Sequence, residues 1–173
     1  VERFPARHLV AGSFFASALG YAVLAFSGQP TSLSVLLAFA ILSFGIGIAE
    51  TLTNDLVLAS VSEEKAGAAA ALSETAYEIG AVMGVAFLGS IVTATFRHGV
   101  NVPRAAEEAA SGAALETLGG TLALAERLGE GTREALTASA IAAYDVGVQY
   151  TAGVAIVLSV AAAVVAWRAL ANN

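Results

Sequence analysis

The chain has 173 residues, of which 57% are hydrophobic and 13% are charged, and its formal net charge is −6. A soluble domain carries about 25% charged residues, so this composition indicates an integral membrane protein. Basic residues are too few and too scattered for a nucleic-acid partner. The absence of cysteine excludes disulfides and thiolate metal ligands. We also predict no cleavable signal peptide. A chain that starts at Val1 rather than at Met suggests a piece of a longer protein.

Four apolar runs are each long enough to cross a bilayer as a helix, which requires about 20 mostly apolar residues. The predicted fold is therefore all-α and polytopic. We expect three transmembrane helices within 1–97, an external amphipathic helical segment at 98–144, and a last transmembrane helix with a short cytoplasmic tail at 145–173. The four membrane-spanning runs are placed at about 8–26, 33–58, 67–97 and 146–167.

Small residues mark the faces on which these helices are predicted to pack. Gly12, Ala16 and Gly20 recur at four-residue spacing in the first run. Gly80 and Gly84 form a G-x-x-x-G pair in the third run. Small residues at this spacing let two helix backbones approach closely in a membrane. A turn at 27–32, marked by Gly28 and Pro30, is expected to separate the first two spans.

Acidic residues interrupt the second and third runs. Glu50 and Asn54 share one helix face and Asp55 is predicted to point elsewhere, while Glu74 and Glu78 share a face of the next helix. Because the connection between the two helices is short, Glu50 and Glu74 are expected at nearly the same depth on antiparallel neighbours. A charge within a span costs about 2.5 kcal/mol or more, so such residues usually face a cavity or a partner.

Two interpretations of these carboxylates remain open from the residues alone. Each lies close enough to a helix end to be a solvated residue at the membrane interface, or deep enough to serve a transport site. His8 and His98 lie at predicted membrane edges without a second ligand at metal-binding spacing, so no metal site is expected. No nucleophile elbow is present, and we predict neither a hydrolase nor any bound cofactor.

The segment 98–144 is too polar to span, and it reads as short helices broken at Gly119–Gly120 and near Gly129 and Gly131. With four spans, both chain ends lie on one side of the membrane. The basic residues in short segments on that side predict that both termini are cytoplasmic. These residues are Arg3, Arg7, Lys65 and Arg168.

Four short segments within residues 45–97 carry a resemblance to a known family. They read TLTND (51–55), EKAGAAAA (64–71), ETAYEIG (74–80) and GVAFLGS (84–90). In combination they resemble the 14-span drug:proton antiporters of the major facilitator superfamily, in the branch that exports quaternary-ammonium compounds and multiple drugs. The segments correspond to the end of the twelfth span, the cytoplasmic connection and the thirteenth span of that family. The first and last spans correspond to its eleventh and fourteenth spans by position and hydropathy only.

The resemblance implies an all-helical transporter of the cell membrane, of which this chain lacks the N-terminal spans. It implies that Glu74 and Asp55 bind protons or substrate, with Glu78 as a further candidate. Glu50 is a fourth candidate because of its depth along its helix. The expected partners are protons, lipophilic or cationic small molecules, and the lipid bilayer. Two alternatives are a non-transporting four-helix membrane scaffold, and the same transporter class with an endogenous lipid or metabolite as its cargo.

Overall fold

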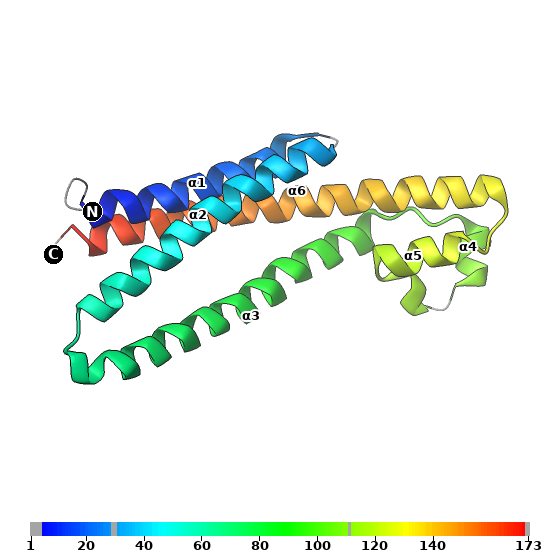
Figure 1. The fold of residues 1–173 in the computed structure, drawn as a ribbon. Helices are drawn as coiled ribbons and strands as arrows, with labels where there is room; N and C mark the ends of the chain where they lie inside the picture. Colours follow the sequence, from blue (N-terminus) through cyan, green and yellow to red (C-terminus); the bar gives the residue numbers. More distant parts are fainter. Residues whose placement is uncertain (1–4, 29–30, 111, 172–173) are drawn as a thin grey trace. The chain divides into compact units, whose positions relative to one another are not determined.

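The computed structural model describes residues 5–28, 31–110 and 112–171. All regular secondary structure in these ranges is helical, which confirms the predicted all-α fold (Figure 1). Four helices are long and apolar enough to cross a membrane. They are α1 (Ala6–Phe26), α2 (Ser32–Ala59), α3 (Ala66–Gly99) and α6 (Glu130–Ala169). Two short helices, α4 (Arg104–Ala109) and α5 (Leu118–Ala125), and two 3₁₀ turns, Glu63–Lys65 and Gly112–Leu115, complete the described structure.

The chain forms two compact units, which are described separately below. Unit 1 comprises residues 1–86 and 152–173, and unit 2 comprises residues 87–151. Both α3 and α6 contribute one part to each unit. The chain passes from unit 1 into unit 2 within α3 and returns to unit 1 within α6.

In unit 1, α1 and α2 lie side by side along a line of small side chains (Figure 1). Gly20 packs against Leu42 and Ala38 of α2, and Gly45 packs against Ser17 and the backbone of α1. Apolar helices gain little from mutual burial in lipid, so close backbone approach through small residues supplies the packing contacts instead. The buried residues of this seam are Ser13, Ser17 and Gly20 of α1 and Ala38, Leu42, Gly45 and Ala49 of α2.

The turn between α1 and α2 uses the residues that helix ends favour. Gly28 has a φ of 63°, the left-handed conformation that only glycine adopts at little cost. Thr31 caps α2, and its hydroxyl accepts a hydrogen bond of 3.2 Å from the backbone N–H of Ser34. Two residues on which the predictions drew, Pro30 of this turn and Arg3 of the N-terminal lead, lie outside the described ranges.

The beginning of α1 and the end of α6 also meet within unit 1. The rings of His8 and Trp167 contact edge to face with centroids 4.7 Å apart, and the Arg7 guanidinium lies 5.6 Å from the Trp167 ring. A tryptophan beside basic groups is typical of a membrane interface. Trp167 and the basic residues around it therefore form a suitable interfacial anchor for both helix ends.

Unit 2 packs the end of α3 and the first part of α6 with the short helices. One buried cluster joins Ala106, Leu124, Ala125 and Leu136, and a second joins Phe96, Ala140 and Ala143. The Ser139 hydroxyl accepts a 2.7 Å hydrogen bond from the backbone N–H of Asn101, which ties the α3–α4 connection to α6. An exposed ion pair of 3.7 Å links Arg97 to Glu116. The polar segment after α3 is thus a folded helical unit with its own core.

Helix α6 begins much earlier than the apolar run that it contains. It has 40 residues from Glu130, which corresponds to about 60 Å of helix, about twice the thickness of the hydrocarbon core. Residues 130–144, predicted to form a separate amphipathic piece, belong to this same helix. The other expected break also shifts, since Gly119 and Gly120 lie in the first turn of α5 after its Thr117 cap.

Candidate functional site

Two adjoining cavities in unit 1 share the facing sides of α2 and the first half of α3. The first, here called the acidic cavity, has a volume of about 260 Å³ and is lined by Glu50, Thr51, Asn54, Asp55, Glu74 and Tyr77. The second, here called the aromatic cavity, has a volume of about 230 Å³. Its lining includes Phe14 and Tyr21 of α1, Glu50 and Thr53 of α2, Tyr77 of α3 and Ser159 of α6.

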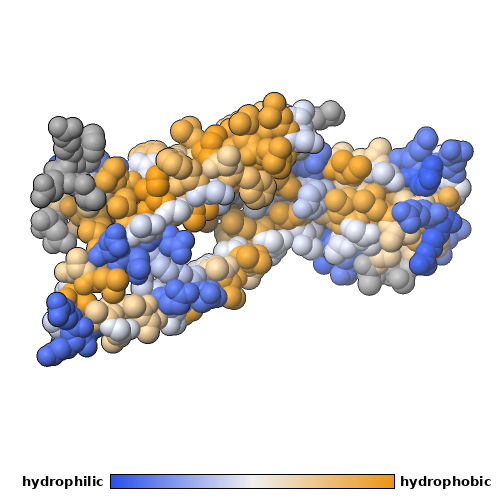
Figure 2. All heavy atoms as spheres, in the orientation of Figure 1, coloured by the Kyte–Doolittle hydropathy of each residue, from blue (hydrophilic) through white to orange (hydrophobic). Residues whose placement is uncertain are grey.

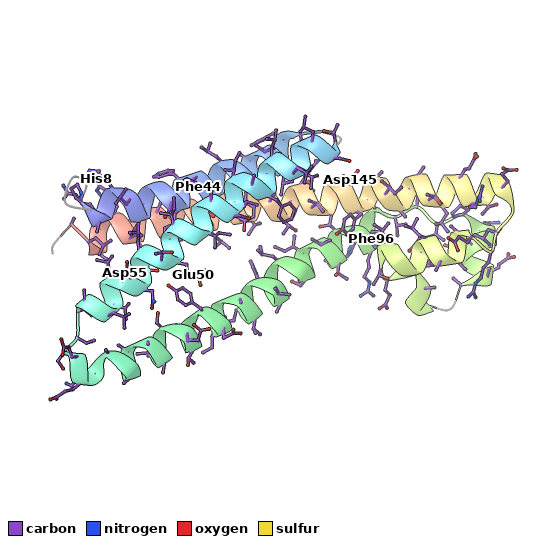
Figure 3. The ribbon with its side chains drawn as sticks, viewed as in Figure 1. His8, Phe44, Glu50, Asp55, Phe96 and Asp145 are labelled. Carbon is purple, nitrogen blue, oxygen red and sulfur yellow. The ribbon has the colours of Figure 1, made fainter. Side chains whose placement is uncertain are left out.

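The acidic cavity brings together three of the four predicted carboxylates. Glu50 and Asp55 come from α2 and Glu74 from α3, and Figure 3 labels Glu50 on the side of α2 that faces α3. Glu78, one turn beyond Glu74, is exposed and does not line this cavity. The short α2–α3 connection therefore places Glu50 and Glu74 together, as the sequence predicts.

The position of Asp55 was predicted only in part. We expected it to point away from Glu50, yet both side chains line the same cavity. At 100° per residue, Asn54, Thr51 and Asp55 lie about 40°, 100° and 140° around the axis from Glu50. These four side chains cover a continuous arc of α2 that faces the cavity. Asp55 thus does point in a different direction from Glu50, as predicted, but the prediction did not foresee that one cavity extends over the whole arc.

These carboxylates are not covered by other residues of the described chain, and no ion pair of the described ranges involves them. Glu50, Asp55 and Glu74 are exposed, while Asn54 is half-buried. The ion pairs found in the described part of the chain, Arg97–Glu116 and Arg133–Glu130, both belong to unit 2. The acidic cavity is thus a concentration of negative charge between apolar helices, which suits a cation or protons. Figure 2 shows hydrophilic residues along the facing sides of α2 and α3 and hydrophobic residues over α1.

Tyr77 is a site residue that the sequence analysis missed. Its hydroxyl lies 2.7 Å from the Thr53 hydroxyl and 3.4 Å from the Glu50 carbonyl oxygen, so it connects α3 to α2 at the cavities. The signal was available, because Tyr77 lies three residues after Glu74 on the same side of the helix.

The predicted packing glycines divide into two groups. A Cβ at Gly20 would lie 2.7 Å from Leu42 Cγ, so this glycine is needed for the contact of α1 with α2. A Cβ at Gly12, Gly80 or Gly84 would meet no atom of the described chain within 4 Å. Their role in packing remains a prediction that concerns surfaces outside the described residues.

No cluster of three His, Asp or Glu side chains in the described ranges has the arrangement of a metal site. The residues of the acidic cavity supply carboxylate, amide and hydroxyl groups, and those of the aromatic cavity supply rings. Such a combination can recognise an organic cation through charge and through the faces of aromatic rings.

The fold and the site together define a polytopic helical membrane protein with a charged cavity among its spans. No family model matches the chain, and no solved structure matches it. The chain is 42% identical over 165 residues to the multidrug efflux pump LfrA of Mycolicibacterium smegmatis, which covers 95% of the chain and 33% of LfrA. It is 30% identical over 131 residues to the methyl viologen resistance protein SmvA of Salmonella typhimurium, which covers 74% of the chain and 26% of SmvA. The chain therefore spans about a third of the length of these relatives.

Proposed function

We propose that the chain is part of a proton-coupled transporter that exports lipophilic, often cationic, compounds from the cell. The observation that carries this proposal is the similarity of nearly the whole chain to LfrA, named a multidrug efflux pump, combined with the acidic cavity among its spans. SmvA, named for resistance to methyl viologen, is a second relative whose name refers to an organic cation. These relatives support an efflux transporter over a four-helix scaffold.

The chemistry of the acidic cavity accounts for exchange of a cation for protons. A proton and an organic cation can each bind to the same carboxyl group, so the two compete for it. We propose Glu74 and Asp55 as the principal carboxylates that bind the proton or the cation, and Glu50 as a third. Glu78, one turn beyond Glu74 and outside the acidic cavity, is an accessory group. Release of the cation on one side and of the proton on the other drives alternating access between the two halves of the transporter.

Finer assignments belong to the same proposal. We assign the chain to the 14-span branch of the major facilitator superfamily, with its four long helices as the last four spans. The preceding spans of the same protein then complete the transport pathway. Both ends of the chain lie in the cytoplasm, and residues 98–144 form a helical segment on the outer side of the cell membrane.

The test is ethidium efflux from energised cells that express the intact protein with Glu74→Gln. This change keeps the shape of the side chain but removes the group that titrates. Loss of a charged hydrogen-bonding partner costs about 1.5–3 kcal/mol, so efflux should fall about 10- to 100-fold. Glu64→Gln is the matched control, because Glu64 is exposed in the turn before α3 and lines neither cavity. Wild-type efflux by Glu74→Gln would remove Glu74 from the mechanism.

A further inference from the structure

Two residues line both cavities and therefore form the wall between them. Glu50 contributes from α2 and Tyr77 from α3, and both appear in the lining of the acidic and of the aromatic cavity. Among the described residues that line the acidic cavity, Tyr77 alone is aromatic. A movement of its ring away from α2 would remove its part of the wall and join the two cavities.

A hydrogen bond holds this wall in place, and its direction follows from counting protons. The Thr53 hydroxyl lies 2.7 Å from the carbonyl oxygen of Ala49 and 3.1 Å from that of Glu50, on its own helix. A hydroxyl has one proton to donate. When Thr53 gives its proton to one of these backbone acceptors, the Tyr77 hydroxyl donates to Thr53 across the 2.7 Å that separates the two oxygens, and the Glu50 carbonyl oxygen at 3.4 Å is its more distant acceptor. Thr53 thereby connects Tyr77 to the backbone of α2.

We propose that Tyr77, held by Thr53, is a specificity-determining residue that limits the size of the bound ligand. The proposal rests on the proposed function, because its ligand is the organic cation that the site exports. With the Tyr77–Thr53 hydrogen bond formed, the ligand occupies a single cavity of about 230–260 Å³. When this bond is broken, the ring can move, and one larger cavity accepts a bulkier cation with its apolar groups beside Phe14 and Tyr21.

The arrangement predicts how two conservative substitutions behave. Tyr77→Phe keeps the ring and removes the donor, whereas Thr53→Val keeps the shape of the side chain and removes the acceptor. Both break the same hydrogen bond, so each should favour bulky over small cations by a similar factor. The double variant should add nothing further, because residues that act through one shared bond are not additive.

The experiment measures the Kd of two cations for the purified intact protein by calorimetry. Tetraethylammonium and tetraphenylphosphonium carry the same single charge, and the second is larger and more apolar, with four aromatic rings. The ratio of their Kd values should shift toward tetraphenylphosphonium by about two- to tenfold in both single variants, the range of one net hydrogen bond. A general loss of folding would weaken both ligands and lower the Tm, and would not move the ratio in one direction.

Two control variants each lose a hydroxyl group at a position that is not part of the wall between the cavities. Thr75→Val removes a hydroxyl that bonds only to Ala71 of its own helix, and Tyr150→Phe alters an exposed tyrosine of α6 in unit 2. Both should keep the wild-type ratio. An unchanged ratio in Tyr77→Phe and Thr53→Val overturns this inference and leaves the proposed function standing. A wild-type protein that binds neither cation overturns both.

Discussion

Gly45 of α2 lies directly against Ser17 of α1, at a distance that leaves no room for a side chain. A Cβ at Gly45 would lie 2.5 Å from Ser17 Oγ and 2.7 Å from the Ser13 carbonyl oxygen. The Ser17 hydroxyl donates to that same Ser13 carbonyl at 3.2 Å, within α1. The hydroxyl groups of Ser13 and Ser17 are therefore hydrogen-bonded within α1. Packing of α2 against them requires only a small residue at position 45.

Gly45→Ala should therefore destabilise the protein, because the added methyl group must push α1 and α2 apart. Overpacking of this kind costs about 1–3 kcal/mol. We expect a lower Tm for the detergent-purified protein and a smaller yield of monodisperse material.

Gly47→Ala is the matched control, since a Cβ at Gly47 meets no described atom within 4 Å. Alanine also has a better helix propensity than glycine by about 1 kcal/mol, so this variant should be as stable as the wild type or more stable. Equal Tm values for the two variants would show that α1 and α2 can accommodate a methyl group at position 45 without a loss of stability.

Glu78→Gln should reduce ethidium efflux less than Glu74→Gln, because Glu78 lies outside the acidic cavity that Glu74 lines. Glu74→Asp should retain partial efflux, since the charge survives on a shorter side chain. The measurement is initial efflux rate at matched expression, with a pH gradient imposed in either direction. If Glu78→Gln reduces the efflux rate more than Glu74→Gln, then Glu78, and not Glu74, is the main carboxylate that exchanges a proton for the cation.

A single cysteine at position 119 should react with an impermeant thiol reagent added to intact cells, whereas one at position 64 should react only after permeabilisation. Gly119 and Glu64 are both exposed, so access depends on the side of the membrane and not on burial. The neighbouring Gly120 is unsuitable, because a Cβ there would lie 2.7 Å from the Ala114 carbonyl oxygen. The opposite labelling pattern would reverse the proposed orientation.

Gly84→Leu should impair assembly of the intact protein more than Val85→Leu. A Cβ at Gly84 would meet no described atom of another helix within 4 Å, and Val85 is exposed. A difference between them therefore reports packing against other spans, where a small residue allows close approach. The readout is the amount of folded protein in the membrane. Similar yields for both variants would mean that this side of α3 faces lipid.

The length of the apolar runs was sufficient to predict the four long helices, because hydropathy over about 20 residues reports the bilayer directly. It was insufficient to predict where α6 begins. Residues 130–144 are polar enough to leave the membrane, yet they contain no proline after Glu130 and continue as the same helix. Hydropathy locates the water boundary, whereas helix ends depend on caps and on helix-breaking residues.

The candidate site was also predicted only in part, because some of its features are local in the sequence and others depend on contacts between helices. The pairing of Glu50 with Glu74 follows from a short hairpin, which is local information. The role of Tyr77 depends on its hydrogen bond to Thr53, 24 residues away. Gly45 against Ser17 is likewise a contact between helices. Spacing along one helix identifies a face, but only the neighbouring helix determines which residue on that face makes the contact.

The division of α3 and α6 between the two units has a consequence for how this chain can vary in evolution. Residues 87–151 form one continuous stretch of the chain, and α3 and α6 each run as unbroken helix across its boundary with unit 1. Neither cavity takes a lining residue from this stretch. Insertions or deletions between Val100 and Gly129 can therefore change the size of unit 2 and leave every residue around Glu50, Glu74 and Tyr77 in the sequence.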